Sequence, residues 1–559
     1  MARGRARQRR RRARGMTAAL AAAAAAAAAV TVTALPVGSH PAGPVASARL
    51  AAWTVTRKAD GDINVTINEL SDPAGLQSTL RADGVPASVT FLSRPNPACS
   101  PLGFGPGLLG KIFPEPASGV VHHRGQHTTP IPAAFGHTSV PTELCGYTVS
   151  QLRSAYGISA SPYTGKGATI AVVLDGYSPT MLADANRFFA GQGVPGFAPG
   201  QYTEDFGGDG ESASALGASC DNEPDQPEEA LDVETAHIAA PDAHVVYMGS
   251  DCAGDGEQNF LDTMTSIVDH HLADVVTDSY SIIESQFSPA DVAAWSLTFE
   301  QGALEGIGFN FDSGDGGNYG DGVGGAQFPA SDPWATAVGG TSLEIGAHGT
   351  PVAQYGWGDG FTQENAAGTG YLEPLPDGGS DGSQGGLSTF FAEPSYQKGV
   401  VPAALATDDG TIPAARVVPD IAADAGSHWL IGYTGAITSG VYGQVAMGGG
   451  TSGASPLVSG LEADAEQASG HAVGFANPAI YQLAGTPAIH DILPVNLNDP
   501  PLVFGPIPDD LQSADNYLIA LGQDDGAEPG YDAVTGVGAA TPAFVTAFGS
   551  PFQGAHGRR

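Results

Sequence analysis

The sequence predicts an α/β fold in which a parallel sheet is covered by helices on both faces, preceded by a small β-α-β segment. Near-continuous apolar runs occupy residues 168–176, 243–249 and 273–281. Runs without alternation are typical of strands that are buried on both faces of a sheet. Segments of helical composition, such as residues 178–191 and 291–306, lie between or after these runs. With 559 residues and 42% hydrophobic content, the chain can bury a large core in one α/β unit.

Residues 1–48 have the composition of an export signal. Eight arginines within "MARGRARQRRRRARG" precede an apolar run over residues 16–35, and Ala46-Ser47-Ala48 offers a small-residue cleavage site. A run of about 20 residues is also long enough for an uncleaved membrane anchor. The sequence therefore predicts a signal peptide and a secreted, extracellular protein, with anchoring as the alternative.

The net charge is strongly acidic. It is −37 for the whole chain and becomes −45 without residues 1–48, which contain eight arginines and no acid. A surface of this charge repels nucleic acid and anionic membranes, so we expect neither as a partner. It suits acid conditions, in which many carboxylates are neutralised.

Residues 49–140 differ from the rest of the chain in composition and hydrophobic pattern. Residues 62–70 alternate like a strand, residues 72–84 indicate a short helix with its cap and stop, and residues 85–92 indicate a second strand. Irregular chain rich in proline, glycine and histidine follows and is typical of a linker. We therefore expect a small leading segment and linker before the main domain.

The four cysteines form an even set in a chain expected to be exported, so disulfides are expected. The simplest of the three connectivities pairs Cys99 with Cys145 and Cys220 with Cys252. The sequence contains no CxxC pair and no His/Cys zinc spacing.

An acidic helix is predicted over residues 226–241, "QPEEALDVETAHIAAP", because Pro227 suits a first turn and Pro241 a stop. Glu228 and Asp232 are four residues apart and share a face of this helix, one turn apart. Two carboxyl groups at that spacing can share a proton, which separates their effective pKa values. The alternative is a solvated acidic face.

A strand that leads into a glycine-rich loop is predicted over residues 309–322, "FNFDSGDGGNYGDG". Asp315 stands where glycines would let a substrate backbone approach closely. A cation loop and an ordinary acidic turn are the alternatives. The spacing does not match the EF-hand pattern.

A strand and turn followed by a helix are predicted around "GGGTSGASPLVSG", residues 448–460. Ser452 would stand at the helix entrance, where backbone N–H groups and the positive end of the dipole stabilise an oxyanion. The glycines would leave room for a peptide. A nucleophilic serine needs a base. The usual base is histidine, but no H-G-T-H-like helix is present, and the nearest positional counterpart is the helix that carries Glu228 and Asp232.

These motifs together resemble the sedolisin (serine-carboxyl peptidase) family. "EEALD", "SGDGG" and "GGTSGASP" supply Glu, Asp, Asp and Ser in the family's chain order. Residues 328–343, 385–397 and 416–425 are each similar to a family signature. The resemblance covers about residues 145–550.

The resemblance implies a subtilisin-like fold and a role for each residue. Ser452 would be the nucleophile, Glu228 the general base, Asp232 its support and Asp315 the oxyanion acid. Asp315 can donate a hydrogen bond only while it is protonated, so an acidic pH optimum is expected. The chain would then be a secreted, monomeric peptidase that hydrolyses protein or peptide substrates through an acyl-enzyme on Ser452. It would be made as a precursor with three parts: a signal peptide at 1–48, a pro-segment and linker at 49–140, and the peptidase domain at 145–552.

The C-terminal region resembles the family's calcium site. The resemblance implies one structural Ca²⁺, held by hard oxygen ligands from two stretches near residues 488–494 and 526–538. Asp491 and Asp532 would bind by side chain. Ile492, Glu528 and Gly530 would bind by backbone oxygen.

Two other functions are alternatives to the peptidase hypothesis. A catalytically silent cell-surface binding protein on the same fold would have no reason to retain Glu228, Asp232, Asp315 and Ser452 together. An esterase has no support, because no G-x-S-x-G elbow with ordered Asp and His partners is evident. The sequence leaves open whether a peptidase would cut internally or remove tripeptides.

Overall fold

The computed structural model divides the chain into two compact units. The larger comprises Val140–Glu364, Tyr371–Phe504 and Tyr517–Arg559, and the smaller comprises Met1–Ser139, Asn365–Gly370 and Gly505–Asn516. The structure describes residues 53–57, 63–67, 78–79, 82, 120–121, 146–205, 226–250, 256–317, 325–345, 349–363, 379–438, 440–494, 502–506, 517–521 and 526–548.

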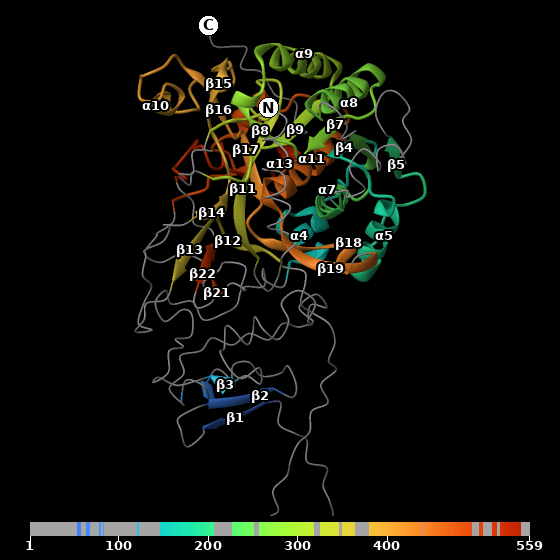
Figure 1. Ribbon diagram of the computed structural model, residues 1–559, viewed down its shortest axis with the longest axis vertical. Coiled ribbons are helices and arrows are strands. Elements are labelled where there is room, and N and C mark those ends of the chain that lie inside the picture. The colour runs from blue at the N-terminus through green and yellow to red at the C-terminus, as the bar shows by residue number, and fades with distance from the viewer. Residues whose placement is uncertain are drawn as a thin grey trace, which may run out of the picture. The chain divides into compact units, whose positions relative to one another are not determined.

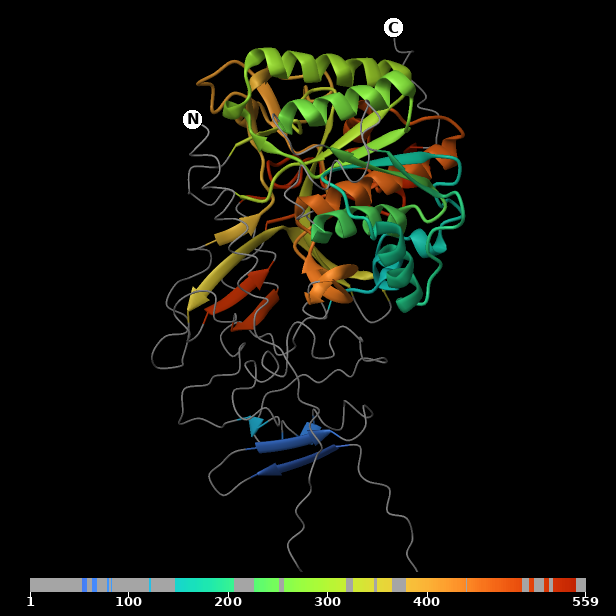
Figure 2. The same ribbon diagram turned by 45° about the vertical axis from the view of Figure 1, so that its right-hand side comes forward.

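A ten-stranded sheet forms the centre of the larger unit (Figures 1 and 2). The pairs from β5 across to β23 are all parallel, whereas β20 and β12 pair antiparallel at β23 and β11. The three apolar runs of the sequence form β4, β6 and β7 of this sheet, so the predicted α/β fold with a parallel sheet is confirmed. In spatial order the strands are β20 (Ile489–His490), β23 (Ala539–Ala540), β17 (Ile421–Asp424), β11 (Thr336–Ile345), β9 (Gly308–Asp312), β7 (Val275–Asp278), β4 (Thr169–Asp175), β6 (His244–Ser250) and β5 (Tyr202–Asp205), with β12 (Pro351–Gly356) beside β11.

Helices cover both faces of the sheet. Figure 2 shows α8 and α9 on one side of the strands and α7 and α11 on the other. The helices are α4 (Val149–Ala155), α5 (Met181–Gly191), α7 (Gln226–Ala239), α8 (Gly256–His270), α9 (Pro289–Glu305), α10 (Ala403–Ala406), α11 (Gly450–Ser469), α12 (Asn477–Leu483) and α13 (Phe544–Phe548), with short 3₁₀ turns η3 (Ile158–Ala160) and η4 (Glu284–Gln286).

The central strands are buried on both faces because their alternate side chains pack against different helices. Thr277 on β7 points to α11, where its hydroxyl lies 2.9 Å from that of Ser455. Phe309 on β9 points to the opposite face, where its ring packs against Phe299 of α9 with 4.8 Å between the ring centroids. Period-two alternation directs neighbouring residues to opposite faces, and both faces are apolar here. This explains why the sequence shows near-continuous apolar runs.

Smaller sheets and hairpins surround the central sheet. The hairpin of β18 and β19 leads directly into α11, so its position fixes where that helix begins. The remaining strands are the pair β8 (Ile282–Ile283) and β10 (Gln327–Phe328), the pair β15 (Gly386–Ala392) and β16 (Ala415–Val418), the hairpin β18 (His428–Thr438) and β19 (Val441–Gly448), and the four-stranded sheet β14 (Gly379–Gly382), β13 (Gly358–Gln363), β22 (Tyr517–Leu521) and β21 (Leu502–Pro506).

The smaller unit contains a three-stranded antiparallel sheet of β1 (Trp53–Arg57), β2 (Ile63–Ile67) and β3 (Val120–Val121). β2 coincides with the first strand predicted there, and residues 78, 79 and 82 are helical as predicted. The second predicted strand, residues 85–92, lies outside the described residues. β1 was not predicted from the sequence, and it pairs antiparallel with β2.

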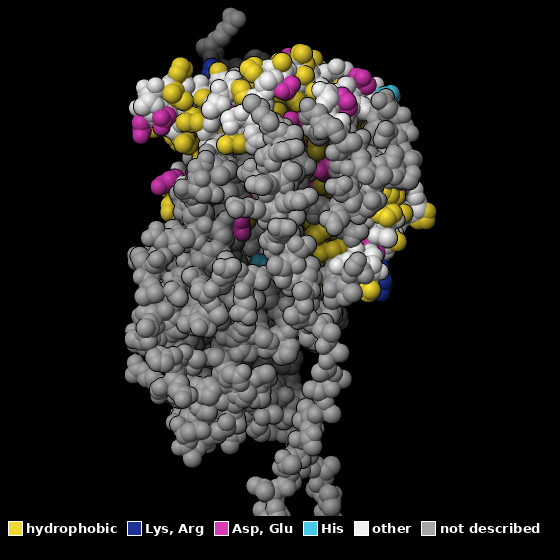
Figure 3. Space-filling model, viewed as in Figure 1, with side chains coloured by type: hydrophobic (Ala, Val, Ile, Leu, Met, Phe, Trp, Pro, Cys, Tyr) yellow, Lys and Arg dark blue, Asp and Glu magenta, His cyan; other side chains and the backbone are white. Residues whose placement is uncertain are grey.

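Several sequence predictions fall on residues that the structure does not describe. These are the export signal of residues 1–48 and all four cysteines, Cys99, Cys145, Cys220 and Cys252. Among the described helices, none has the length and apolar character needed to cross a membrane. On the face shown in Figure 3, acidic side chains lie at the described surface over α9 and α10.

Candidate active site

The first turn of α11 is built from glycines whose α-carbons are covered by other side chains. A methyl group on Gly449 or Gly453 would overlap the indole ring of Trp429, and one on Gly450 would meet Asp315 Oδ2 at 2.5 Å. Gly450 also has a φ of 61°, which favours glycine. Glycines that were expected to leave room for a bound peptide make room here for the protein's own tryptophan and aspartate.

Ser452 lies half-buried in the first turn of α11, and its carbonyl accepts a hydrogen bond from a residue that follows a strand of the sheet. Pro456, four residues further along the helix, has no N–H to donate to this carbonyl. The hydroxyl of Ser279, which follows β7, donates to the Ser452 carbonyl oxygen at 3.1 Å. The turn that carries Ser452 is therefore tied to the C-terminal end of β7.

Helix α7, predicted from the acidic motif, packs directly along α11 (Figures 1 and 2). A Cβ on Gly453 would lie 3.5 Å from Leu231 Cδ1, and a Cβ on Gly460, about two turns further on, would overlap Ala239. The later residue of α11 lies beside the later residue of α7, so the two helices run in the same direction. Their N-terminal turns therefore lie at the same end of the pair.

Glu228 and Asp232 lie in the N-terminal half of α7, one turn apart. Glu228 is half-buried, whereas Asp232 is fully buried. Burial and then the neighbouring Glu228 raise the pKa of Asp232. The Ser279 hydroxyl acts in the opposite direction, and Asp278 and Asp312 add to the increase. A buried acid stacked on a second acid favours a state in which the pair holds one proton.

Asp315 lies exposed in the loop after β9, and its carboxyl group faces the start of α11. Its Oδ1 accepts a hydrogen bond from the Thr451 N–H at 2.8 Å and lies 2.7 Å from Thr451 Oγ1. The loop is held by β14: the Gly382 N–H donates to the Asp315 carbonyl, and the Gly317 N–H donates to the Gly382 carbonyl, each at 2.9 Å. A carboxyl group therefore stands beside the residue that precedes Ser452.

Three neighbouring parallel strands, β4, β7 and β9, each end on an aspartate, namely Asp175, Asp278 and Asp312. Asp278 and Asp312 are buried. Burial and then Asp312 raise the pKa of Asp278, whereas burial and then Asp315 raise the pKa of Asp312 to about 7. Sequence reasoning missed these acids. The signal was present, because each follows an apolar run directly, at the edge of an α/β sheet where ligands bind.

The four predicted catalytic residues thus lie on the N-terminal turns of the parallel α7–α11 pair and on the loop beside the start of α11. Ser452 and Glu228 are half-buried, Asp315 is exposed and Asp232 is fully buried. A hydroxyl at a helix start, a stacked carboxyl pair and a third carboxyl at the same helix start are the groups that acyl transfer requires. Sequence reasoning missed Ser279, because a single hydroxyl residue follows no pattern.

The residues expected at the calcium site lie on two adjoining segments. Asp491 and Ile492 follow β20, and Glu528, Gly530 and Asp532 precede β23. The Gly530 N–H donates to Asp491 Oδ1 at 2.9 Å and joins the two segments.

The carbonyl oxygens of this donor set suit a hard cation, whereas both Asp532 carboxylate oxygens also accept backbone N–H groups. The Asp532 side chain is buried at 3% exposure. Within the described residues, the carbonyl oxygens of Ile492, Glu528 and Gly530 accept no hydrogen bond. Carboxylate and carbonyl oxygens are the ligands that Ca²⁺ prefers. No group of three or more His, Cys, Asp or Glu side chains that could hold a metal occurs in the described part of the chain, so a cation here would depend on these carbonyls.

Comparison with known proteins places the chain beside characterised peptidases. It is 31% identical to kumamolisin from Bacillus sp. (strain MN-32) over 414 residues, which are 72% of this chain and 63% of that protein. It is 26% identical to sedolisin from Pseudomonas sp. (strain 101) over 360 residues, 62% of this chain and 55% of that protein. The chain therefore matches less than two thirds of the length of these relatives. No family model matches it.

Among solved structures, the fold is similar to that of Pseudomonas sedolisin, a serine-carboxyl proteinase complexed with two molecules of pseudo-iodotyrostatin. The TM-score is 0.54 at 22% identity, over 72% of this chain and 97% of that one. At this identity the likeness shows the fold alone.

Proposed function

Because this chain belongs to the sedolisin family and has its subtilisin-like fold, we propose that it is an acid-acting serine-carboxyl peptidase. One observation carries the proposal. The N-terminal turns of α7 and α11 lie at the same end of a closely packed parallel helix pair, and they bear the stacked carboxyls and Ser452 respectively. The substrates are proteins or peptides.

In this mechanism Glu228 takes the proton of the Ser452 hydroxyl as the oxygen attacks a peptide carbonyl. Glu228 then returns the proton to the leaving amine, and water hydrolyses the acyl-enzyme by the reverse roles. Asp232, whose pKa is raised by burial and by Glu228, shares a proton with the base and holds it in place. Glu228 can serve as the base in place of the usual histidine, because the buried Asp232 keeps the carboxyl pair from ionising fully.

Asp315 acts as the oxyanion acid. Its Oδ1 is fixed by the Thr451 N–H, which leaves Oδ2 to carry a proton toward the negative oxygen of the tetrahedral intermediate. The positive end of the α11 dipole adds to this stabilisation. Only the protonated carboxyl can donate, so activity should fall as pH rises.

The test is hydrolysis of an unfolded protein substrate from about pH 2 to about pH 8. Wild type is compared with Ser452→Ala and with Ser469→Ala. Ser469 is a matched control because it lies at the other end of the same helix, where its hydroxyl bonds to backbone carbonyls. We expect activity confined to acid, a loss of at least about 10³-fold in Ser452→Ala, and little change in Ser469→Ala.

Full activity in Ser452→Ala would reject the peptidase mechanism. Absence of activity in a folded, matured wild type would instead favour the silent cell-surface binding protein.

We further propose that Asp491, Ile492, Glu528, Gly530 and Asp532 hold one structural Ca²⁺. Its support is the pair of carboxylates and the three carbonyls that accept no hydrogen bond among the described residues. Removal of calcium with a chelator should lower the unfolding temperature, and added Ca²⁺ should restore it. Asp491→Asn should weaken the Ca²⁺ affinity measured by calorimetry. An unfolding temperature insensitive to chelation would contradict the site.

Secretion and maturation are proposed from residues 1–140. The arginine-rich start, the apolar run and Ala46-Ser47-Ala48 support export. N-terminal sequencing of protein from the culture medium and of protein incubated at acid pH should give one start near residue 49 and another beyond residue 140. Retention in the membrane fraction would favour the uncleaved anchor.

A further inference from the structure

The hydroxyl of Thr451 has more oxygen neighbours than it has protons. Thr451 Oγ1 lies 2.7 Å from Asp315 Oδ1 and 3.3 Å from Asp312 Oδ2, and it accepts a hydrogen bond from the Gly314 N–H at 3.1 Å. It therefore joins the oxyanion acid on one side to a buried acid at the end of β9 on the other.

A count of protons limits how these groups can be arranged. A threonine hydroxyl has one proton to donate and two lone pairs to accept with. The Gly314 N–H takes one lone pair, and the hydroxyl proton goes to one carboxyl oxygen. The other carboxyl oxygen then faces the remaining lone pair, and this contact is favourable only if that carboxyl supplies a proton.

The two distances indicate which carboxyl supplies it. The shorter contact, to Asp315, takes the hydroxyl proton, because 2.7 Å is the usual length of a donated O–H···O hydrogen bond and 3.3 Å is longer than that. Asp315 Oδ1 also accepts the Thr451 N–H, as expected of an acceptor. The longer contact, to Asp312, is therefore the one in which the carboxyl supplies the proton.

We propose that Asp312 is a positioning residue that is protonated in the active enzyme and donates a hydrogen bond to Thr451, which in turn donates to Asp315. This proposal rests on the proposed function and deepens it. Asp312 directs the Thr451 proton to Asp315 Oδ1, so that Oδ2 is the oxygen that carries the acid proton toward the substrate.

The surroundings of Asp312 favour its neutral form. The side chain is 4% exposed. The ionisable groups that act on it or are acted on by it are all acids: Asp315 in the next loop, Asp278 on β7 and Asp232 on α7. The Ser281 hydroxyl, which donates to Asp312 Oδ2 at 2.8 Å, the Thr451 hydroxyl and the Gly314 backbone lower the pKa of Asp312, but burial and Asp315 outweigh them. A buried acid among acids keeps its proton, consistent with a pKa raised by burial and by Asp315 to about 7.

The experiment compares Asp312→Asn with Asp312→Ala in the matured full chain, by kcat and KM on a peptide substrate across the pH range. The amide of Asn can donate to Thr451 as the protonated acid does, whereas Ala cannot. We expect kcat to fall about tenfold in Asp312→Ala with KM unchanged, and less than about threefold in Asp312→Asn. As pH rises towards about 7 the ratio of Asp312→Asn to wild type should rise, because Asp312 begins to ionise there and the amide does not.

Two further variants keep the result interpretable. Asp464→Asn is a matched control, because Asp464 is a buried acid on α11 whose charge neighbours are Arg153 and Asp242. Its pH profile should match that of wild type. Thr451→Val removes the shared hydroxyl, so Thr451→Val and the double variant with Asp312→Ala should be equally impaired, because both act through one group.

An Asp312→Asn variant as impaired as Asp312→Ala at acid pH would overturn the proposal, because it would mean that an ionised Asp312 is required. Wild-type kcat in Asp312→Ala would also overturn it. If Ser452→Ala is inactive in the same assay, either result rejects the role of Asp312 alone. Full activity in Ser452→Ala would reject the peptidase assignment as well.

Discussion

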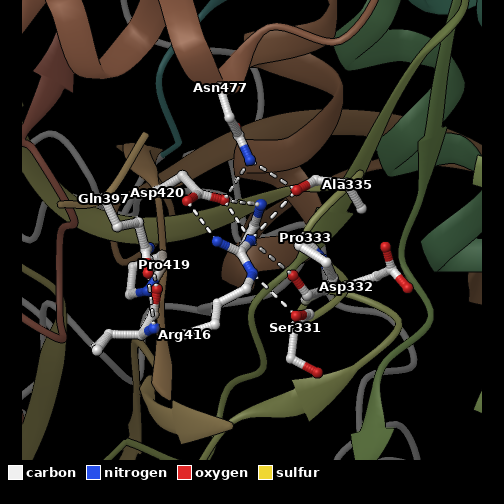
Figure 4. A network of polar contacts seen from close by, with 12 residues as sticks. Ser331, Asp332, Pro333, Ala335, Gln397, Arg416, Pro419, Asp420 and Asn477 are labelled. Carbon is white, nitrogen blue, oxygen red and sulfur yellow. Dashed lines mark hydrogen bonds and ion pairs between the residues drawn. The ribbon is translucent and has the colours of Figure 1, made fainter. Parts of the chain in front are cut away.

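Two of the buried polar networks in the described part of the larger unit differ in what their carboxyl groups have as partners. At the ends of β7 and β9, buried acids face other acids. Around Arg416, by contrast, a buried acid faces a guanidinium group. Arg416 Nη1 and Nη2 donate to the two oxygens of Asp420 at 2.9 Å and 2.7 Å, while Nε donates to the Ser331 carbonyl at 2.9 Å (Figure 4).

The carboxylate at the centre of the Arg416 network accepts several further hydrogen bonds. The Asp420 carboxylate also accepts from Asn477 Nδ2 at 3.2 Å, from the Tyr481 hydroxyl at 2.9 Å and from the Ala337 N–H at 2.8 Å. Burial alone would lower the pKa of Arg416, yet Asp420 raises it overall. Both charges are therefore fixed, and the network joins segments that lie far apart in the sequence.

Among the described residues, the charge partners of the acids near Ser452 are other acids rather than a cation. Burial raises the pKa values of Asp232, Asp278 and Asp312, and their neighbouring acids add to it. A group with a raised pKa in the folded state stabilises the fold below its unfolded pKa, near about 4, and that stability is lost as pH rises through the folded pKa. A buried acid paired with a cation thus serves structure, whereas buried acids among acids can serve proton transfer.

The strongest way to break the Arg416 network is Arg416→Met. It leaves Asp420 buried without its cation, so the free energy of unfolding should fall by about 3–5 kcal/mol at pH 7. The deficit should shrink at acid pH, where an acid without its cation can take up a proton. Urea unfolding at both pH values measures this.

Arg153→Met is the matched control for that variant. Arg153 donates to the carbonyls of His237 and Ile238 and is half-buried, so its loss should be smaller. Equal losses in the two variants would show that the buried ion pair has no special weight.

The opposite sign is expected for Asp232→Asn. Removing a buried acid that resists ionisation should raise stability at pH 7 and leave it unchanged near pH 3, where wild-type Asp232 is neutral. Activity should fall about 100-fold, because Glu228 loses the group with which it shares a proton. Kinetics and urea unfolding on the same samples test both. A loss of stability at pH 7 would mean that Asp232, like Asp420 beside Arg416, stabilises the fold through its charge.

The sequence predicted elements whose signal is local. Strands β4 and β6 follow from continuous apolar runs, and α7 and α11 follow from periodicity, proline and glycine signals. The stacking of Glu228 on Asp232 follows from helical spacing alone. Pairings between distant segments, such as β13 with β22, leave no local pattern and could not be predicted.

The same limit applies within the site. Gly449 and Gly453 make room for Trp429, which pairs with Met447 in the β18–β19 hairpin; the register of that hairpin was not predicted, so Trp429 could not be placed beside them from sequence. Arg416 and Asp420 are four residues apart outside any helix, so helical spacing could not predict that they meet.

A third prediction separates the effect of burial from that of neighbouring charge. Glu462 on α11 is fully buried, and its Oε2 accepts from Asn310 Nδ2 at 2.8 Å. Burial, with a smaller contribution from Glu466, raises the pKa of Glu462 to about 8. Glu462→Gln should therefore flatten the fall in stability between pH 4 and pH 8 by more than about 1.4 kcal/mol, the free energy of one pKa unit.

Urea unfolding across that pH range measures the slope. Glu305→Gln, at an exposed position on α9, should leave it unchanged. An unchanged slope in Glu462→Gln would mean that burial with one acidic neighbour, Glu466, is not enough to hold the proton.

The smallest effect is expected at the neutral hydrogen bond from the Ser279 hydroxyl to the Ser452 carbonyl. Ser279→Ala removes a side-chain donor to the Ser452 carbonyl, which receives no N–H from the residue four positions along the helix because that residue is Pro456. The free energy of unfolding should fall by about 1 kcal/mol, and kcat should fall with little change in KM as the turn loosens. Pro456→Ala in the same chain supplies an N–H four residues along the helix, so it should recover part of both losses. If Pro456→Ala recovers stability but not kcat, then Ser279 acts on the carboxyl pair through Asp232 rather than on the position of Ser452.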